Sequence, residues 1–272
     1  MTGETADPID GSALGAAFRA VGVREAGTLL VHSSLSSLGW VDGGAAAVVD
    51  ALATVLGPRG TLVVPTLTFD TVCARQPVFH EILTPSIVGR ITEEVRTRPD
   101  AVRSLHPTHS VAAIGPDAAA LCEGHHLWDS PCAPASPFGR LVDRHAQVLM
   151  IGVGLESFTM MHAFEEWAEV PWLFNRTETL YVITRSCEIH TVVSRRHTDD
   201  PRYEERDFPS LEPLLADAGA LTYGAAGPSV LRLVDSWAAR DVIVPLLRRD
   251  PDAVLGPGRH RQRQERGDGV PT

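Results

Sequence analysis

The sequence predicts a mixed α/β fold: one central, largely parallel sheet flanked by helices, with a small antiparallel β region in the C-terminal part. Two observations predict it. In the first 65 residues, a helical segment, a short apolar strand, a polar loop, a second helix and a second strand follow one another, as in a parallel α/β unit. After Pro171, two neighbouring segments alternate between apolar and polar residues, as antiparallel strands do.

The N-terminal half divides into short elements bounded by Gly, Pro and Asp. We expect a first helix that is capped by Asp10 or Ser12 and ends near Val21, because its apolar residues recur at helical spacing. The run 29–31 is short and apolar, as in a buried strand. A loop is expected over residues 66–86. The other expected elements are helices over 45–56, 87–96 and 118–123 and strands over 60–65 and 110–114.

The C-terminal half contains a strand, a hairpin and two further helices by the same criteria. Residues 124–140 are expected to form a long ordered loop, followed by a strand over 146–153. Segments 179–185 and 188–194 predict a hairpin closed around Ser186 and Cys187. Helices are expected over 210–218 and from 230 to about 240.

Composition limits the classes of function. The chain has 272 residues and a net charge of −10, which argues against nucleic acid as a partner. Its basic residues are all Arg, which excludes lysine Schiff-base chemistry. The four cysteines lack metal-type spacing and suit a reducing compartment, and we see no signal peptide or membrane-length apolar run. We therefore expect a cytoplasmic protein with one domain over residues 10–256 and disordered tails at 1–9 and 257–272.

A histidine with carboxylates one helical turn away lies in the segment 151–169. The segment leaves a strand, turns at Gly152 and Gly154, and enters a helix that carries His162, Glu165 and Glu166. A His at the carboxyl end of a strand, with a carboxylate on the same helical face, suits a general base with its orienting partner. The spacing equally suits a partly buried His that packs or caps, with both glutamates on a solvated face.

A polar loop follows the first expected strand, with the sequence HSSLSSLG from His32 to Gly39. An open α/β sheet binds its ligand at the carboxyl ends of its strands, so this loop is a candidate binding segment. The alternative is a serine-rich turn whose hydroxyls cap the next helix.

Several separated segments resemble the aminoglycoside 3-N-acetyltransferase family, an antibiotic N-acetyltransferase fold distinct from the GNAT fold. The resemblance runs in order over residues 14–245. It implies an α/β fold in which coenzyme A lies in a cleft and the acceptor amine enters beside it. The segments that carry it are LLVHSSLSSLG, GGAAAVVDAL, GPRGTLVVPT, RSLHPTHSVAAIGP, SPCAPASPFGRL, VLMIGVG and TMMHAFEEWAEVPW.

The resemblance also implies roles for individual residues. Thr159, His162 and Glu165 match a T-x-x-H-x-x-E element that supplies the base, with Glu166 as the reserve carboxylate. Acetyl-CoA is the implied co-substrate, and no metal is expected. The residues expected along its pantetheine and diphosphate are His32, Ser33, Ser34, Ser36, Arg103, His106, Pro107, Ser110, Ser136, Pro137 and Phe138.

The chemistry of these residue types agrees with acetyl transfer to the 3-amino group of a 2-deoxystreptamine ring. An ammonium group must lose a proton before it attacks a thioester. A neutral imidazole, with an ordinary pKa of about 6.5, can take that proton at cellular pH. A carboxylate on the other ring nitrogen fixes the tautomer and stabilises the imidazolium. We expect direct transfer in a ternary complex, with a backbone N–H or the Thr159 hydroxyl stabilising the oxyanion.

The acceptor itself is less constrained. Carboxylates suited to a polycationic aminoglycoside occur in an acidic cluster whose candidate substrate contacts are Asp199, Asp200 and Glu204, joined by Glu166. Interleaved arginines also make this cluster a plausible solvated loop.

The sequence is also compatible with other functions. Phe158, Met160 and Met161 are expected to make the approach to His162 bulky and apolar, which favours a biosynthetic N-acyltransferase acting on a non-aminoglycoside amine. A catalytically silent sugar- or CoA-binding protein is a second alternative, and a nucleophilic cysteine is another route. A metal hydrolase is the least supported, because no H-E-x-x-H is present; its candidate ligands are His106, His109, His125 and His126. The partner is expected to be a small amine, with no nucleic acid or membrane, and the chain a monomer or homodimer.

Overall fold

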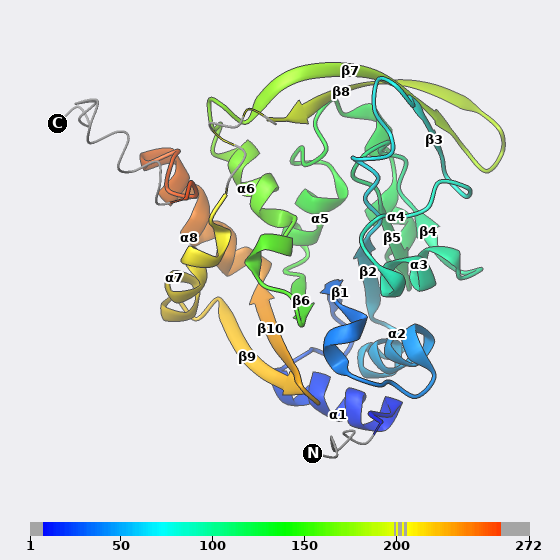
Figure 1. Ribbon diagram of the computed structural model, residues 1–272, viewed down its shortest axis with the longest axis vertical. Helices are drawn as coiled ribbons and strands as arrows, with labels where there is room; N and C mark the ends of the chain where they lie inside the picture. Colours follow the sequence, from blue (N-terminus) through cyan, green and yellow to red (C-terminus); the bar gives the residue numbers. More distant parts are fainter. Residues whose placement is uncertain (1–7, 199, 201–202, 204–205, 257–272) are drawn as a thin grey trace, which may run out of the picture.

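The computed structural model describes residues 8–256 except 199, 201–202 and 204–205, so the expected tails at 1–7 and 257–272 lie outside the described residues. Two sheets organise the described chain (Figure 1). The larger has seven strands in the order β4-β5-β2-β1-β6-β10-β9, and the smaller has three in the order β3-β7-β8. This arrangement confirms the predicted mixed α/β fold with a separate antiparallel region. The strands of the large sheet are β1 (Thr28–Ser33), β2 (Thr61–Pro65), β4 (Val102–Arg103), β5 (Val111–Ile114), β6 (Gln147–Ile151), β9 (Leu221–Ala226) and β10 (Ser229–Asp235).

The centre of the large sheet is parallel. Strand β1 pairs in parallel with β2 on one side and with β6 on the other. Antiparallel pairing then adds β5 to β2, β4 to β5, β10 to β6 and β9 to β10. Strands β4, β2, β1, β6 and β9 consequently run in one direction, and β5 and β10 in the other. The carboxyl ends of β1, β2 and β6 meet at one edge of the sheet, where an open α/β sheet binds its ligand.

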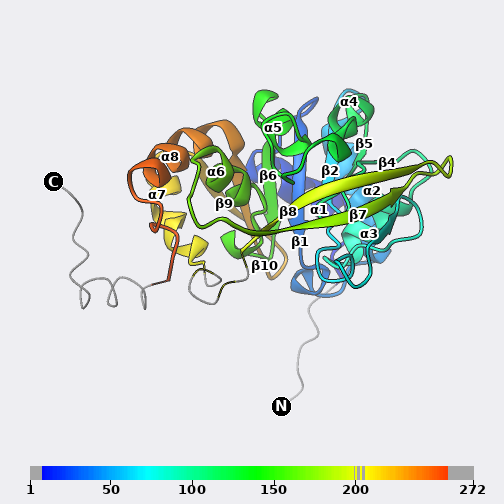
Figure 2. The ribbon, with the colours of Figure 1, turned by 90° about the horizontal axis from the view of Figure 1, so that it is seen from above.

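Successive residues of the central strands face opposite layers, because side chains alternate across a sheet. Leu29 and Val31 pack with α1, α2 and α3, whereas Leu30 between them packs with α4, α5, α6 and α8. Figure 2 shows helices on both sides of the sheet. The helices are α1 (Gly11–Val21), α2 (Gly44–Leu56), α3 (Arg90–Thr97), α4 (Ala118–Cys122), α5 (Pro137–Asp143), α6 (Met160–Trp167), α7 (Glu212–Asp217) and α8 (Ser236–Arg249). The Asp10 carboxylate accepts from Ala13 N at 2.8 Å and caps α1, as predicted.

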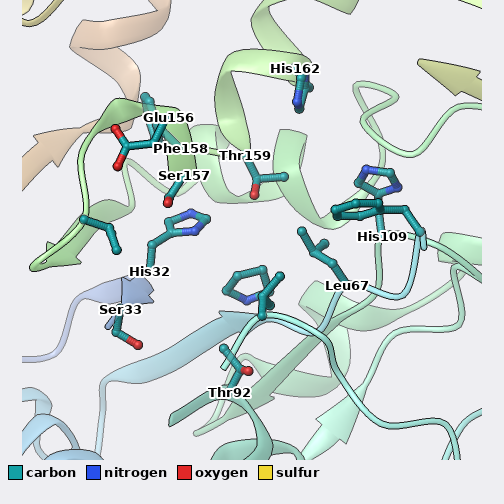
Figure 3. A pocket seen from close by; sticks show the side chains of 14 residues that line it. His32, Ser33, Leu67, Thr92, His109, Glu156, Ser157, Phe158, Thr159 and His162 are labelled. Carbon is teal, nitrogen blue, oxygen red and sulfur yellow. The ribbon is translucent and has the colours of Figure 1, made fainter. Parts of the chain in front are cut away.

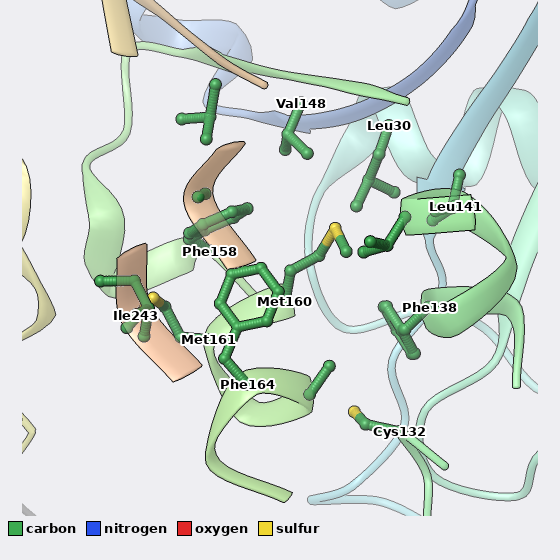
Figure 4. Packing of buried hydrophobic residues seen from close by; sticks show 14 of the residues in the cluster. Leu30, Cys132, Phe138, Leu141, Val148, Phe158, Met160, Met161, Phe164 and Ile243 are labelled. Atoms are coloured by element: carbon green, nitrogen blue, oxygen red, sulfur yellow. The ribbon is translucent and has the colours of Figure 1, made fainter. Parts of the chain in front are cut away.

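The layer that carries α6 is a continuous apolar core. Figure 4 shows Met160 and Met161 among Val148, Phe164 and Ile243, and both methionines are fully buried. The expectation of a bulky, apolar approach to His162 is therefore wrong for Met160 and Met161, whereas Phe158 does line a cavity together with His162. The two methionines lie on the core face of α6, where burying apolar area fixes the rotation of the helix about its axis.

The predicted hairpin is confirmed and is longer than expected. Strands β7 (Phe174–Ile183) and β8 (Ile189–His197) pair antiparallel, and the chain turns at Cys187, whose φ is 65°. The short strand β3 (Val78–His80) pairs in parallel with β7 within the segment expected to be loop. Its three residues gain their partner from about 100 positions away, so local pattern could not reveal it.

The expectation of a helix beginning near residue 230 is wrong. Residues Ser229–Asp235 form β10, which pairs with β6, and α8 begins only at Ser236. The Asp235 carboxylate accepts from Trp237 N at 3.1 Å and Ala238 N at 3.0 Å, so it caps the helix at this later point. Strand β9, which extends the sheet beyond β10, has no counterpart in the predicted elements. No helix among the described residues has both the length and the apolar character to cross a membrane.

The boundary between β10 and α8 can be tested at Asp235. We expect Asp235→Ala to lower the free energy of unfolding by about 1 kcal/mol, because it removes the N-cap acceptor. Asp235→Asn keeps an acceptor oxygen and should lose much less. Urea denaturation of both variants measures the difference. Equal losses in both would indicate that the ion pair with Arg24, at 3.8 Å, matters more than the cap.

Candidate active site

The candidate site centres on His162 in α6. A cavity of about 270 Å³, here called the inner cavity, lies beside this residue. Its wall comes from the end of β1, the segment after β2 and the segment between β6 and α6, so it occupies the predicted edge of the sheet. Figure 3 shows His162 and Thr159 on α6 facing the cavity across from His32 and Leu67. The residues that line it are His32, Ser33, Pro65, Leu67, Phe69, Val88, Thr92, His109, Val153, Glu156, Ser157, Phe158, Thr159 and His162.

The turn before α6 requires glycine. Gly152 has φ of 64°, and a Cβ there would lie 1.8 Å from the Ser37 Oγ, so a larger residue would displace the serine loop after β1. The chain then makes one 3₁₀ turn (Leu155–Ser157) and enters α6 with Thr159 at the N-cap position. This turn brings the loops after β1 and β6 together beside His162.

His162 is held by a buried carboxylate. Its Nδ1 lies 2.7 Å from Glu165 Oε2, and Arg206 Nε donates to Glu165 Oε1 at 3.0 Å. Burial alone would raise the pKa of Glu165, but the hydrogen bond and charge of His162 and the charge of Arg206 hold it below its ordinary value. The carboxylate therefore stays ionised and accepts from Nδ1–H, which leaves Nε2 of His162 with a lone pair. The structure thus pairs His162 with Glu165, the carboxylate expected to orient it, and not with the reserve carboxylate Glu166.

A second cavity meets His162 from the other side. This hairpin cavity, of about 580 Å³, lies between α6 and the end of β8. Its wall includes Phe69, His109, Glu156 and His162, which also line the inner cavity. The imidazole consequently stands at the junction of two cavities. The remaining lining residues of the hairpin cavity are Asp70, Cys73, Arg176, Arg196, His197, Thr198, Arg206 and Phe208.

A third cavity, of about 810 Å³, adjoins the inner cavity at Ser33. We call it the helix-end cavity because the N-terminal ends of α2 and α3 contribute Gly44 and Arg90 to its wall. Free backbone N–H groups and the helix dipole favour anions at helix N-termini, and the Arg90 guanidinium adds a positive charge. Trp40, 75% exposed, supplies an aromatic surface to the same cavity.

Four of the expected cofactor residues line these cavities. His32 and Ser33 face the inner cavity, and Ser33, Ser34 and Ser36 face the helix-end cavity. Burial lowers the pKa of His32 to about 4, so its ring is neutral at cellular pH. Ser34 Oγ and Ser36 Oγ lie 3.1 Å apart.

The other expected cofactor residues lie in the interior. Arg103 contacts Ser110 Oγ at 3.1 Å and the carbonyl oxygens of Glu81 and Thr84 at 3.0 and 2.6 Å, so it fastens the segment around β3 to the main sheet. The residues that line neither the inner nor the helix-end cavity are Arg103, His106, Pro107, Ser110, Ser136, Pro137 and Phe138. All of them are buried. Arg103 and Ser110 hydrogen-bond within the fold, whereas His106 Nε2 and Ser136 Oγ have no hydrogen-bond partner among the described residues.

The expected substrate-facing carboxylates divide into two groups. Asp199 and Glu204 lie outside the described residues, and Asp200 is partly exposed. The Glu166 side chain is 6% exposed and accepts from Cys132 N at 3.2 Å, from the Ser130 hydroxyl and from His197 Nε2 at 2.9 Å. It therefore does not face the hairpin cavity, because one helical step of about 100° turns it away from Glu165.

Several residues of the site were not predicted from the sequence. Glu156 lies in the 3₁₀ turn that follows β6, so the rule that ligands bind at carboxyl strand ends could have indicated it. His109 lies inside the HPTHS segment and was considered only as a ligand of the metal-hydrolase alternative, whereas His106 and Ser110 were expected along the cofactor. Arg206 and His197 reach His162 through tertiary structure alone. Within residues 8–256 as described, no group of three or more His, Cys, Asp or Glu side chains is arranged to hold a metal ion.

An imidazole oriented by a buried carboxylate, as at His162, has the chemistry of a general base, and it stands between two cavities. Comparison with known proteins specifies the class. Residues 30–248 match the family model of aminoglycoside 3-N-acetyltransferase. The chain belongs to this family, whose members are acyltransferases, which confirms the resemblance found in the sequence.

Curated relatives of this chain are named aminoglycoside N(3)-acetyltransferases. Aminoglycoside N(3)-acetyltransferase VII of Streptomyces paromomycinus is 36% identical over 60% of this chain and 62% of its own length. Aminoglycoside N(3)-acetyltransferase IV of a Salmonella species is 32% identical over 87% of each chain. The first of these matches thus spans less than two thirds of the relative.

Solved structures share the fold over nearly the whole chain. Aminoglycoside acetyltransferase AAC(3)-Xa superposes with a TM-score of 0.82 at 27% identity, over 92% of this chain and 95% of that one. AAC-VIa bound to sisomicin superposes with a TM-score of 0.74 at 27% identity, over 89% of this chain and 98% of that one.

Because Glu165 is buried as a charged group, we expect its contribution to the free energy of unfolding to depend on pH. Removing one partner of a buried ion pair typically costs about 3–5 kcal/mol, so Glu165→Gln should lower the free energy of unfolding by that order at neutral pH. A lowered folded-state pKa stabilises the protein above the ordinary glutamate pKa, and this contribution is lost as pH falls through the folded-state value. The difference between wild type and variant should therefore shrink below about pH 4.

Urea denaturation at neutral and acidic pH measures this difference. Glu25→Gln, which alters an exposed carboxylate, serves as the matched control and should change stability little at either pH. A Glu165→Gln deficit that stays constant with pH would contradict the ionised state assigned to Glu165.

Proposed function

We propose that this chain transfers an acetyl group from acetyl-CoA to the 3-amino group of the 2-deoxystreptamine ring of aminoglycosides. The transfer is direct, in a ternary complex, with His162 as general base and residues 10–256 as the catalytic domain. The observation that carries the proposal is the position of His162 at the junction of the inner and hairpin cavities. Family membership and the sisomicin bound to AAC-VIa support the acetyl donor and the class of acceptor.

The donor fits the inner and helix-end cavities, which adjoin each other at Ser33. The N-terminal ends of α2 and α3, together with Arg90, suit the diphosphate, because backbone N–H groups and a guanidinium bind phosphate oxygens well. Trp40 offers a face on which a nucleobase can stack. Ser33 lies in both walls, so an extended pantetheine chain passing it leads the thioester towards His162.

The acceptor enters through the hairpin cavity. Its amine nitrogen attacks the thioester carbonyl carbon while Nε2 of His162 takes a proton, and Glu165 stabilises the resulting imidazolium. When the tetrahedral intermediate collapses, the carbon–sulfur bond breaks and His162 returns the proton to the thiolate. Thr159 lines the inner cavity and does not use its side chain to cap α6, so its hydroxyl can donate to the oxyanion.

A second candidate acceptor is favoured by the charge of the hairpin cavity. Asp70 and Glu156 offer carboxylates to a cation, but Arg176, Arg196 and Arg206 line the same wall. Guanidinium groups disfavour a polycation and favour an amine that carries an anionic group. The alternative function is therefore acyl-CoA-dependent N-acylation of a non-aminoglycoside amine in a biosynthetic pathway.

Replacing His162 tests the general base. A positioned base contributes about 10²–10⁴-fold, so His162→Ala should lower kcat by this factor and leave the residual rate that positioning provides. The measurement is free thiol released from acetyl-CoA with a panel of 2-deoxystreptamine aminoglycosides and simple amines. His190→Ala, which changes a hairpin histidine that lines neither cavity, should keep wild-type turnover.

The same panel separates the two acceptor classes. Turnover with aminoglycosides supports the first candidate, and turnover only with amino acids or other anionic amines supports the second. Wild-type rates in His162→Ala would exclude this residue as the base, and no thiol release with any amine would overturn the proposed function.

Replacing Arg90 tests the donor cavity. Hydrogen bonds to charged groups contribute about 1.5–3 kcal/mol, so Arg90→Ala should raise KM for acetyl-CoA by about tenfold or more with kcat nearly unchanged. Arg90 is exposed, so the fold should be unaffected. Arg90→Lys retains the charge and should recover part of the affinity. An unchanged KM in Arg90→Ala would place the diphosphate elsewhere.

A further inference from the structure

A second histidine–carboxylate pair stands beside the first. His197, the last residue of β8, places Nε2 2.9 Å from Glu166 Oε1. Its ring centroid lies 4.7 Å from that of His162, with the two planes tilted by 39°. Adjacent residues of α6 thus orient two neighbouring imidazoles, Glu165 that of His162 and Glu166 that of His197. The mechanism described above uses only the first pair.

The second pair lies in the wall of the cavity that the proposed function assigns to the acceptor. His197 lines the hairpin cavity, and its side chain is 11% exposed. Because Nε2–H donates to Glu166, Nδ1 carries the lone pair, and no hydrogen bond from the described residues occupies it. A group bound in the hairpin cavity can therefore reach a basic nitrogen on His197 as well as on His162.

The carboxyl of this pair is poised between its two protonation states. Burial raises the pKa of Glu166 to about 7, although donation from Ser130 and Cys132 and the charges of Arg195 and His162 oppose the rise. Burial and the charge of His162 lower the pKa of His197, so its ring is neutral in the resting site. The charged and titratable groups that face the pair are His109, Cys132, His162, Glu165, Arg195, Arg196 and Arg206.

The proposed reaction has two protons to move. An ammonium nitrogen carries three hydrogens, and the nitrogen of the product amide carries one. One of the two lost protons ends on the thiolate sulfur through His162. The other must leave the nitrogen before attack, because an ammonium group has no lone pair. Nε2 of His162 can take up only one proton. A second proton acceptor next to it would allow the ammonium form of the substrate to bind and react.

We propose that His197 and Glu166 form this second acceptor, which converts the bound ammonium group to the free amine. Nδ1 of His197 takes the proton, and the Nε2 proton moves to the Glu166 carboxylate, so the pair gains one proton and loses its negative charge. After the product leaves, the reverse shift returns the proton to water in the hairpin cavity. This role rests on the proposed function, since it requires an ammonium acceptor.

The test is the pH profile of Glu166→Gln. Glutamine keeps an oxygen that accepts from His197 Nε2 and Cys132 N, but it cannot take a proton, and the His162–Glu165 pair is untouched. Only acceptor that is already deprotonated in solution can then react. For an amine whose pKa lies about two units above the assay pH, about one molecule in a hundred is in that form, so kcat/KM should fall by up to about a hundredfold.

The loss should disappear as pH rises. In Glu166→Gln, kcat/KM for the acceptor should increase about tenfold per pH unit and approach the wild-type value near the pKa of the amine. A control acceptor with a pKa well below the assay pH should react at the wild-type rate in the variant. His197→Gln, which keeps a side chain at the cavity wall without a basic nitrogen, should show the same recovery.

Other outcomes overturn the proposal. A wild-type pH profile in Glu166→Gln and His197→Gln would show that the second pair takes no proton. A loss that is equal at every pH and for both acceptors would assign the pair a structural role only. Failure of the proposed function itself is distinct, because the wild type would then release no thiol with either acceptor.

Discussion

The site depends on one buried charge, the Glu165 carboxylate between His162 and Arg206. An ionised group in the interior is tolerated only when opposite charge and hydrogen bonds offset its desolvation, and Glu165 has both at 2.7 and 3.0 Å. The pair joins α6 to the segment that precedes α7, two parts of the chain 41 residues apart. It also sets the tautomer of His162, so the same interaction that closes this part of the fold decides which ring nitrogen is basic.

The sheet explains why two cavities meet at that nitrogen. Parallel pairing of β2, β1 and β6 brings their carboxyl ends to one edge, and Gly152 allows the loops after β1 and β6 to approach closely. The apolar face of α6 is buried against this sheet, which turns His162 outward at the same edge. The hairpin β7–β8 then closes the far side and delivers His197. Each wall of the site therefore comes from a different layer of the fold.

The sequence pattern correctly predicted the features that depend on residues close together in the chain. Alternating elements, the Asp10 cap and the spacing of His162 and Glu165 depend on residues a few positions apart, and all appear in the structure. The features that the pattern did not reveal depend on partners that are distant in the sequence. Residues 229–235 form a strand because β6 pairs with them, although their apolar content also suits a helix. Arg103 is buried because carbonyl groups of a distant loop surround it, and Arg206 and His197 reach the site only after the chain has folded.

The contrast between Glu165 and Glu166 shows how one helix can give two adjacent carboxylates different chemistry. The side chain of Glu165 is fully buried, that of Glu166 is 6% exposed, and each accepts from a histidine. Burial alone would raise the pKa of Glu165, but the hydrogen bond and charge of His162, together with the charge of the Arg206 guanidinium, hold it below the ordinary value. Among the described residues, the donors to Glu166 besides His197 are the neutral Ser130 hydroxyl and the Cys132 N–H, with Arg195 acting at longer range, so burial prevails and the pKa of Glu166 rises to about 7. A carboxylate fixed as an anion can stabilise an imidazolium, whereas one poised near neutrality can exchange a proton. The difference arises from the partner that the 100° step along the helix presents to each residue, not from the residue type.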